Sequence, residues 1–230
     1  LDSKTKRVQE LKTECENKSR LLSPKESKVK MLLDLEKNMD GYSGAVKSVI
    51  NRSEQGSLSG IHGAVSQLIT VDDEYSTAIE VALGAAMQNI VTDTEADAKR
   101  AIYYLKQNKL GRATFLPISS IKSRVLDERN LDDNLGFVAV ASDIVECESR
   151  YKTIISSLLG RCVIAEDMDS AIGISKIYNN RFKIVTLDGQ VINPGGSMSG
   201  GSRAKNAGIL SRANLIETEK EEAEKIKISF

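Results

Sequence analysis

The glycine-rich segment from Pro194 to Gly201 is the stretch whose composition most resembles a ligand-binding loop. A phosphate-binding P-loop requires the pattern G-x-x-x-x-G-K-[ST], and a dinucleotide-binding fold carries its glycines after the first strand. This segment lacks the lysine and follows the last predicted strand, so it meets neither requirement. Paired glycines also permit positive φ angles and close backbone contacts, which leaves a flexible loop or a contact with a second chain as alternatives.

Side chains for catalysis or metal binding are sparse. The single histidine, His62, lies in the segment Gly60–Gly63 with no recognisable nucleophile setting, so we expect a turn residue before a strand rather than a general base. The cysteines Cys15, Cys147 and Cys162 are far apart and contain no C-x-x-C pair, so we expect neither a zinc site nor a disulfide framework. Free thiols are typical of a reducing compartment.

Local gaps in the acidic residues predict a phosphate-binding surface. The chain has 32 basic and 32 acidic residues and no net charge, so bulk electrostatics favours neither nucleic acid nor a membrane. Between Asp97 and Asp127, however, 29 residues contain seven bases and no acid, and residues 41–53 and 189–216 also lack acids. Bases that share a face would bind phosphates, whereas a solvated helix face is the alternative. The candidate DNA-binding residues are Lys47, Arg52, Lys106, Lys109, Arg112, Lys122, Arg124, Arg203, Lys205 and Arg212.

An internal duplication predicts the elements that position these residues. Five residues between Tyr75 and Gly84 recur with the same spacing, 76 positions later, between Tyr151 and Gly160. Each copy reads as strand, helix, short strand, helix and strand. The predicted elements are opening strands at Gly63–Thr70 and Phe137–Val145, helices at Glu74–Leu83, Arg150–Leu159, Asp97–Gln107 and Ser170–Tyr178, and closing strands at Ala113–Leu116 and Lys183–Thr186. Asp188-Gly189 predicts a hairpin turn after the last of these.

Both ends of the chain are predicted to be charged helical arms. Residues 1–40 and 211–230 contain 27 charged side chains in 60 positions, against 37 in the 170 residues between them. Pro24 lacks a backbone N–H, so we expect the first helix to break and restart there. Disordered tails are the alternative, but pairing with each other would stabilise both arms. The apolar seams are Val8, Leu11, Cys15, Leu22, Val29 and Leu32, interrupted by Lys18 and Lys25, and in the second arm Ile209, Ile216, Ala223 and Phe230.

Three motifs resemble the hinge of bacterial structural maintenance of chromosomes (SMC) proteins: Gly60–Val65, Gly111–Pro117 and Asn193–Gly201. The resemblance implies an α/β (α+β) fold of two tandem pseudo-repeated lobes flanked by antiparallel coiled-coil arms that pair within the protomer. Each lobe would join the opposite lobe of a second copy in a toroidal homodimer. The expected divisions are an N-terminal arm and junction at 1–50, lobe 1 at 51–125, a linker at 126–135, lobe 2 with the glycine motif at 136–208, and a C-terminal arm at 209–230.

The same resemblance implies a role and site residues. The module would be a non-enzymatic dimerisation hinge, without metal or cofactor, in a cytoplasmic, nucleoid-associated ATPase for chromosome condensation and segregation whose ATP-binding head lies beyond the arms. It would bind DNA without sequence preference near the arm junction, around Gly200–Lys205. A pure dimeriser and a two-lobed ligand- or nucleotide-binding enzyme domain are the alternatives. The dimer-interface residues would be Gly195, Gly196, Met198, Gly200 and Gly201.

Overall fold

The computed structural model describes residues 2–128, 130–202 and 208–228, with side chains from residue 5 onward. The chain divides into two units, which we call the arm unit and the body. The arm unit combines the segment that ends at Asp40 with the segment that begins at Arg212, and the body runs from Gly41 to Ser211. The structure thus divides the chain ten residues earlier than the expected boundary after residue 50, because the helix at Gly44–Glu54 packs on body strands.

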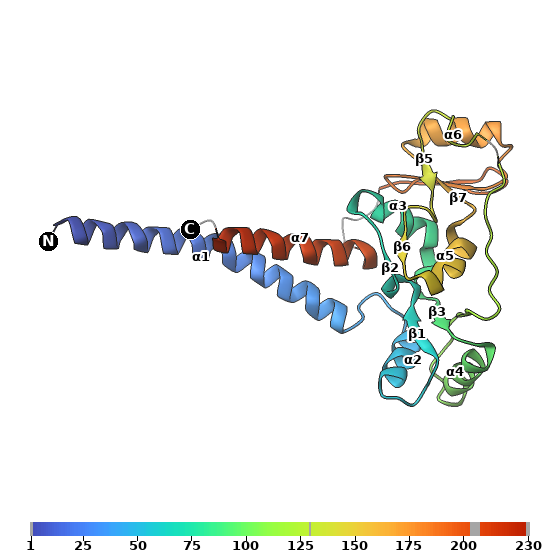
Figure 1. The fold of residues 1–230 in the computed structure, drawn as a ribbon, viewed down its shortest axis with the longest axis horizontal. Coiled ribbons are helices and arrows are strands. Elements are labelled where there is room, and N and C mark those ends of the chain that lie inside the picture. Colours follow the sequence, from blue (N-terminus) through green and yellow to red (C-terminus); the bar gives the residue numbers. More distant parts are fainter. Residues whose placement is uncertain (1, 129, 203–207, 229–230) are drawn as a thin grey trace. The chain divides into compact units, whose positions relative to one another are not determined.

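The arm unit is an antiparallel pair of helices, α1 (Asp2–Lys37) and α7 (Ile209–Ile228), seen side by side in Figure 1. The Lys18 ammonium donates to the carbonyl of Lys227 at 2.8 Å, and Lys25 pairs with Glu222 further toward the start of α7. The two helices therefore run in opposite directions. The predicted pairing of the two arms within one protomer is confirmed.

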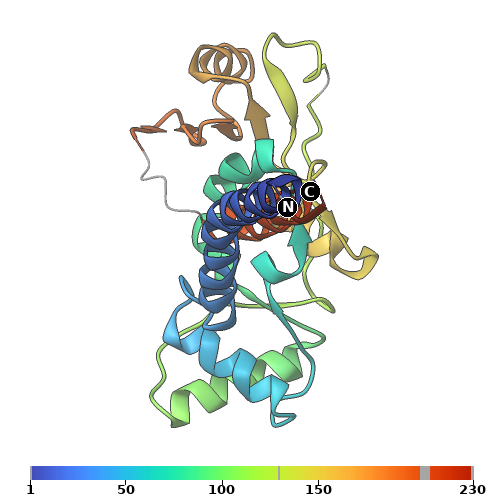
Figure 2. The same cartoon turned by 90° about the vertical axis from the view of Figure 1, so that its left-hand side faces the viewer.

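Pro24 does not break the first arm, so that prediction is wrong. Helix α1 runs without interruption from Asp2 to Lys37 with Pro24 inside it, and its axis changes direction along the way (Figures 1 and 2). Proline removes one hydrogen bond and clashes with the preceding turn, which costs about 3 kcal/mol in a helix interior. The seam on both sides of Pro24 packs on α7, with Leu22 half-buried and Leu32 buried. This packing offsets the local cost, and the helix bends instead of ending.

The arm seam contains charges that the apolar pattern missed. Ile216 and Ala223 are buried as predicted, whereas Phe230 lies outside the described residues. In the part of α7 that belongs to the arm unit, the buried positions Arg212, Ile216, Glu219 and Ala223 and the half-buried Ile226 follow the 4-3 spacing of a coiled coil.

Glu219 is the most buried acid of this seam, with 7% of its side chain exposed. Its two carboxylate oxygens lie 2.5 Å from the Lys28 ammonium and 2.9 Å from the Lys25 ammonium. The hydrogen bonds from Lys28 and then Lys25 lower the pKa of the Glu219 carboxyl. Lys25, which interrupts the apolar seam of α1, is therefore the partner of the acid that interrupts the seam of α7.

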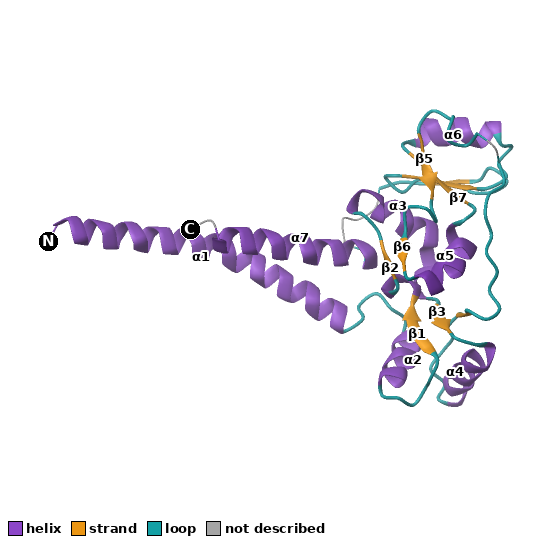
Figure 3. Ribbon diagram, viewed as in Figure 1, coloured by secondary structure: helices purple, strands orange, loops and turns teal. Residues whose placement is uncertain are grey.

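The body is built from three sheets with helices around them (Figure 3). A three-stranded sheet has the order β1-β3-β4, a five-stranded sheet the order β10-β9-β8-β7-β5, and β2 pairs with β6 between them. The strands are β1 (Ile61–Ala64), β2 (Ile69–Thr70), β3 (Ile90–Thr92), β4 (Phe115–Pro117), β5 (Phe137–Val140), β6 (Glu146–Cys147), β7 (Cys162–Ala165), β8 (Lys183–Thr186), β9 (Val191–Ile192) and β10 (Met198–Ser199). The helices are α2 (Gly44–Glu54), α3 (Asp73–Leu83), α4 (Glu95–Gln107), α5 (Lys152–Leu159) and α6 (Met168–Ile177), with 3-10 turns η1 (Val65–Gln67), η2 (Gly84–Gln88) and η3 (Ser149–Tyr151).

Strand pairing confirms the internal duplication. Strand β3 pairs antiparallel with β1 and parallel with β4, and β7 pairs in the same two ways with β5 and β8. The register pairs Ile90 with Phe115 in the first lobe and Val163 with Ile184 in the second. Thr114 is therefore the counterpart of Lys183, so the predicted match of Ala113 with Lys183 is wrong by one residue.

The second helix of each lobe, α4 or α6, has a hydroxyl and a carboxylate at its N-cap and third helical position, but in opposite order. In the first lobe Thr94 is the N-cap of α4, and its hydroxyl accepts from the backbone N–H of Asp97 at 3.3 Å. In the second lobe Asp167 is the N-cap of α6, and its carboxylate accepts from the backbone N–H of Ser170 at 2.8 Å. A hydroxyl and a carboxylate thus occupy the same two positions in opposite order, which satisfies the same free N–H group.

The opening strands are shorter than predicted. A 3-10 turn, η1, separates β1 from β2, and a turn separates β5 from β6. The two second pieces, β2 and β6, then pair with each other, with Thr70 opposite Glu146. These two residues lie 76 positions apart, which is the repeat distance, so a local two-fold axis relating the lobes passes through this pair.

The two lobes share a hydrophobic cluster, and a further cluster around Ile174 and Phe182 belongs to the second lobe. Buried residues from the first lobe, such as Ile79 and Val91, pack in the same cluster as Tyr151, Ile154 and Ile164 from the second. Residues 118–136, apart from the undescribed Arg129, contain neither helix nor strand and join the lobes, and this stretch includes the linker expected at 126–135. The lobes are therefore halves of one compact body and not separate domains.

Candidate dimer edge and nucleic acid interface

The glycine motif forms a hairpin at the edge of the five-stranded sheet. Strand β10 pairs antiparallel with β9, with Met198 opposite Ile192, and the turn is closed by a 2.8 Å hydrogen bond from the Asn193 N–H to the Ser197 carbonyl. Both residues of β10 are exposed, and 54% of Met198 is accessible. On its other side β10 has no partner strand among the described residues. The motif is therefore an exposed sheet edge, with backbone groups free to pair.

Backbone angles and close contacts within the protomer explain three of the glycines in this motif. Gly195 and Gly196 both have positive φ angles, of 88° and 92°, which favour glycine in the turn. A Cβ at Gly200 would overlap the amide of Gln190, and that amide accepts a 2.9 Å hydrogen bond from the Gly201 N–H. These contacts hold β10 in place and argue against a flexible loop. The geometry also differs from a phosphate loop, since the middle of the motif is a strand.

The first lobe offers an edge of its own in β4. This strand pairs on one side with β3 and has no other partner strand among the residues that the structure describes. It belongs to the motif Gly111–Pro117. Phe115 and Pro117 are half-buried, whereas Leu116 points into the shared core. β10 and β4 are thus end strands of their sheets, one in each lobe, and β5 and β1 end the same two sheets on the opposite side.

Five of the predicted DNA-binding bases belong to α2, α4 and the loop between α4 and β4 in the first lobe. Helices α2 and α4 pack against each other and lie side by side in Figures 1 and 2. The guanidinium of Arg52 lies 5.9 Å from the centre of the Tyr104 ring, which links the two helices. Among the described residues, none of these five bases has an ion-pair partner. The group, which we call the α2–α4 basic face, is Lys47, Arg52, Lys106, Lys109 and Arg112.

The remaining predicted bases lie elsewhere. Lys122 and Arg124 are exposed on the linker, where Ser123 bonds Ser156 of α5 at 2.6 Å, and thus away from α2. Arg203 and Lys205 lie outside the described residues.

Arg212 is the one predicted DNA-binding base that the structure removes from the set. Only 10% of its side chain is exposed, and its guanidinium donates to the Asp40 carbonyl at 3.1 Å and lies 3.8 Å from the Asp40 carboxylate. A phosphate could reach it only after this contact is lost. We therefore drop Arg212 as a DNA ligand and assign it to the joint between α1 and α7.

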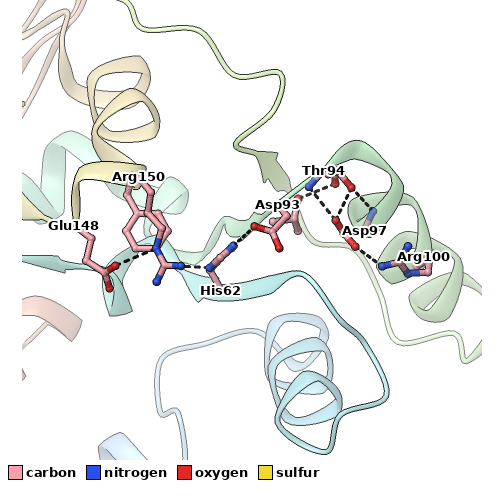
Figure 4. A network of polar contacts seen from close by, with 9 residues as sticks. His62, Asp93, Thr94, Asp97, Arg100, Glu148 and Arg150 are labelled. Carbon is pink, nitrogen blue, oxygen red and sulfur yellow. Dashed lines mark hydrogen bonds and ion pairs between the residues drawn. The ribbon is translucent and has the colours of Figure 1, made fainter.

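His62 joins the lobes and is not a turn residue. It lies within β1, where its Nε2 is 2.7 Å from the Asp93 carboxylate (Figure 4). Its Nδ1 is 3.1 Å from the Tyr151 hydroxyl of the second lobe. The carboxylate can only accept, so Nε2 carries a proton and donates to Asp93. Sequence reasoning missed this role because Tyr151 is 89 residues away in the chain.

Thiol and acid clusters do not add a second site. The three cysteines are free, and burial raises the pKa of the Cys162 thiol to about 12. No group of three or more histidine, cysteine or acidic residues suited to a metal ion occurs within the described ranges. In that same part of the chain, every helix is too short or too polar to cross a bilayer.

Comparison with known proteins identifies the class of this body. Residues 58–175 match the family model described as the SMC proteins Flexible Hinge Domain. The chromosome partition protein Smc of Bacillus subtilis is 44% identical over 195 residues, which is 83% of this chain, and that of Halothermothrix orenii is 40% identical over 90% of it. The chain belongs to the SMC hinge family.

Solved structures agree with this assignment. The hinge domain of Geobacillus stearothermophilus, crystallised as an asymmetric dimer, matches with a TM-score of 0.79 and 38% identity, covering 96% of this chain and 93% of that one. The Pyrococcus furiosus hinge domain matches with a TM-score of 0.59 and 30% identity over 80% of this chain and 93% of that one. The predicted fold class is confirmed. The chain spans 16% and 18% of the two Smc relatives, so the match concerns their hinge region alone.

Proposed function

We propose that this body is a homodimerisation hinge in which β10 of one protomer pairs with β4 of a second copy. The observation that carries this proposal is that β10 and β4, one in each lobe, are end strands of their sheets with no outer partner strand among the described residues. Two such edges allow two identical contacts around a two-fold axis, each adding the five-stranded sheet of one copy to the three-stranded sheet of the other. The related Geobacillus stearothermophilus hinge was crystallised as an asymmetric dimer, which supports dimerisation of this body.

Met198 is the best residue with which to test the interface. It is exposed on β10, whereas bulky residues at Gly200 would collide with Gln190 and disturb the hairpin itself. We expect Met198→Glu to give a folded monomer, since a charge buried in an interface is strongly unfavourable. Leu135→Glu is a matched control, because Leu135 is 93% exposed and belongs to neither edge. A dimeric Met198→Glu variant in light scattering would contradict the assignment.

We propose further that the α2–α4 basic face binds DNA without sequence preference. Five bases without an ion-pair partner among the described residues belong to α2, α4 and the loop after α4. Within the two helices the acids are Glu54 at the end of α2 and Glu95 and Asp97 in the first turn of α4. Asp97 is paired with Arg100, and Glu95 accepts from the Ser119 hydroxyl. The face therefore presents net positive charge to a phosphate backbone. The bases lack interleaved stacking aromatics apart from Tyr103 and Tyr104, which favours phosphate contacts over base recognition.

Salt dependence tests this DNA proposal. About five phosphate contacts predict a slope near −4.5 for the logarithm of the association constant against the logarithm of salt concentration. Reversing Lys106 or Arg112 to glutamate is expected to weaken binding and to flatten the slope by about 0.9 each. Lys176→Glu on α6 of the second lobe is the control. A slope near zero, or equal effects of the three variants, would exclude this face and leave a pure dimeriser.

The Smc relatives, which are longer than this chain, suggest the cellular role of the hinge. By its likeness to chromosome partition proteins, this hinge would join two coiled-coil arms into a ring or rod within an ATPase that organises chromosomes, associated with the cytoplasmic nucleoid. The free cysteines fit a reducing compartment. The nucleotide-binding alternative draws no support from the glycine motif, because β10 occupies its centre. A thermal shift on adding nucleotide would revive it, since ligand at a hundredfold excess over its dissociation constant stabilises a fold by about 2.7 kcal/mol.

A further inference from the structure

Helix α3 holds the beginning of α7 through a buried carboxylate. Glu80 is 5% exposed, and its Oε1 accepts from the backbone N–H groups of Leu210 at 2.9 Å and Ser211 at 3.2 Å, and from the Ser211 hydroxyl at 3.2 Å. The first N–H groups of a helix have no partner within it and carry partial positive charge. Glu80 therefore serves as a cap supplied by a distant element. A Cβ at Gly208 would overlap this carboxylate, which explains the glycine just before α7.

The same helix is held one residue later by the second lobe. The Lys183 ammonium donates to the carbonyls of Val81 at 3.3 Å and Ala82 at 3.0 Å, at the C-terminal end of α3. A cation at this end satisfies carbonyls that lack a partner and opposes the negative end of the helix dipole. Lys183 is the first residue of β8, and β8 is separated from the exposed β10 by β9 alone. Neighbouring residues of α3 thus contact the start of α7 and the sheet that carries β10.

Neither Glu80 of the first lobe nor Lys183 of the second has a charged counterpart in the other lobe. Ser156 takes the position of Glu80 in α5, and it bonds the Ser123 hydroxyl of the linker at 2.6 Å. Thr114 is the counterpart of Lys183 by strand register. The fold can therefore form with neutral residues in these places. Each lobe thus contributes one charge that has no charged counterpart in the other lobe, which indicates a role that the duplication itself does not explain.

We propose that α3 couples the five-stranded sheet to the first turn of α7, with Lys183 and Glu80 as its positioning residues. A shift of β8 moves the C-terminal end of α3 through Lys183, and Glu80 carries this shift to Leu210 and Ser211. Pairing of β10 with a second copy, which is the proposed function on which this step rests, would restrain β9 and β8 and thereby tighten the hold on α7. Formation of the dimer interface would thus strengthen the hydrogen bonds that hold the first turn of α7.

Hydrogen exchange at Leu210 and Ser211 tests the coupling in the whole chain. Lys183→Met touches neither residue, yet we expect it to speed exchange of these amides about tenfold, because hydrogen bonds to charged groups are the strong ones. Glu80→Leu should speed exchange at least as much, and the double variant should add little to Glu80→Leu alone. Lys183→Arg, which keeps the donors and the charge, should restore slow exchange. Ser156→Ala at the equivalent position of α5 is the control and should change neither amide.

Two results would overturn the coupling. One is unchanged exchange at Leu210 and Ser211 in Lys183→Met, and the other is an equal rise at every amide of the body, which would mean general destabilisation. If Lys183→Met fails to fold, Lys183→Gln replaces it with the same expectation. Mass measurements on the same samples keep this test separate from dimerisation, because the Lys183 effect is measurable in a monomer. In the wild-type chain, dilution below the dimer dissociation constant should speed exchange at the two amides, and unchanged exchange there would contradict the link to β10.

Discussion

The two lobes of the body share a backbone plan and differ in what each builds on it. Both have a strand paired antiparallel and then parallel, and both cap their second helix with a hydroxyl and a carboxylate at the same two positions. The first lobe adds α2 and its bases, whereas the second adds the β9–β10 hairpin. The shared features determine the fold. The features found in one lobe alone carry the proposed contacts with DNA and with a second copy.

The helices α3 and α5 sharpen this comparison, because each ends at an equivalent glycine in a different setting. Gly84 has a φ of 51° and open space where a Cβ would lie. Gly160 has an ordinary φ of −68°, but a Cβ there would overlap the carbonyl oxygen of Arg124 in the linker. One glycine is required for its backbone angle and the other for close packing of the linker.

Alanine at the two glycines is therefore expected to have unequal effects. Gly160→Ala should cost about 3 kcal/mol in the free energy of unfolding, because the backbone of the linker must move. Gly84→Ala should cost about 1 to 2 kcal/mol, for the positive-φ backbone conformation alone. Urea unfolding of both variants measures the difference. Equal costs would show that the linker does not pack on α5 as described.

Transplanting one cap into the other lobe tests whether the caps are interchangeable. Thr94→Ala is expected to cost about 1 kcal/mol, the usual value for loss of an N-cap. The double variant Thr94→Asp with Asp97→Ser copies the second-lobe pair into the first lobe, and it should cost less than Thr94→Ala. Thermal unfolding compares them. A double variant that is less stable than Thr94→Ala would show that the lobes are not equivalent here.

Acid should weaken both lobes through these caps. The Thr94 hydroxyl holds the pKa of the Asp97 carboxyl below its ordinary value, and the backbone N–H of Ser170 does the same for Asp167. A lowered pKa in the folded state stabilises the protein above the unfolded value of 3.8 and loses this effect as the pH falls through the folded pKa. The pKa of Glu219 in the arm unit is also lowered, so Glu219 likewise stabilises the protein less as the pH falls. We expect Asp97→Asn with Asp167→Asn to reduce the loss of stability below about pH 4, measured by urea unfolding across pH.

The smallest predicted effect is a difference in reactivity between the thiols, because Cys162 lies in the cluster shared by the two lobes. Cys15 is exposed on α1, whereas Cys162 is buried in the cluster that joins the lobes. A thiolate is the reactive form, and the raised pKa of Cys162 suppresses it. At pH 8 we expect a disulfide reagent to modify Cys15 rapidly and Cys162 only after unfolding. Rapid reaction of Cys162 in the folded chain would mean that the lobes separate.

Much of this body could be predicted from the sequence, because the duplication is written in local patterns. The repeated Tyr-x-Thr-x-Ile segment located both first helices, and Asp188-Gly189 located the β8–β9 hairpin. Contacts between distant residues could not be predicted in this way. Glu80 looks like an ordinary helical acid until Leu210 lies beside it. Arg212 has the sequence pattern of a free base, and only the structure shows that it pairs with Asp40. Pro24 shows the same limit, since packing on α7 overrides a local preference.

The mass of Met198→Glu and of the unaltered chain in solution, measured by light scattering from micromolar to nanomolar concentration, tests the central claim most directly. We predict a dimer of about twice 25.1 kDa for the unaltered chain and for Leu135→Glu, and a folded monomer for Met198→Glu. An unaltered chain that stays monomeric, or a Met198→Glu variant that stays dimeric, would contradict pairing through the β10 edge.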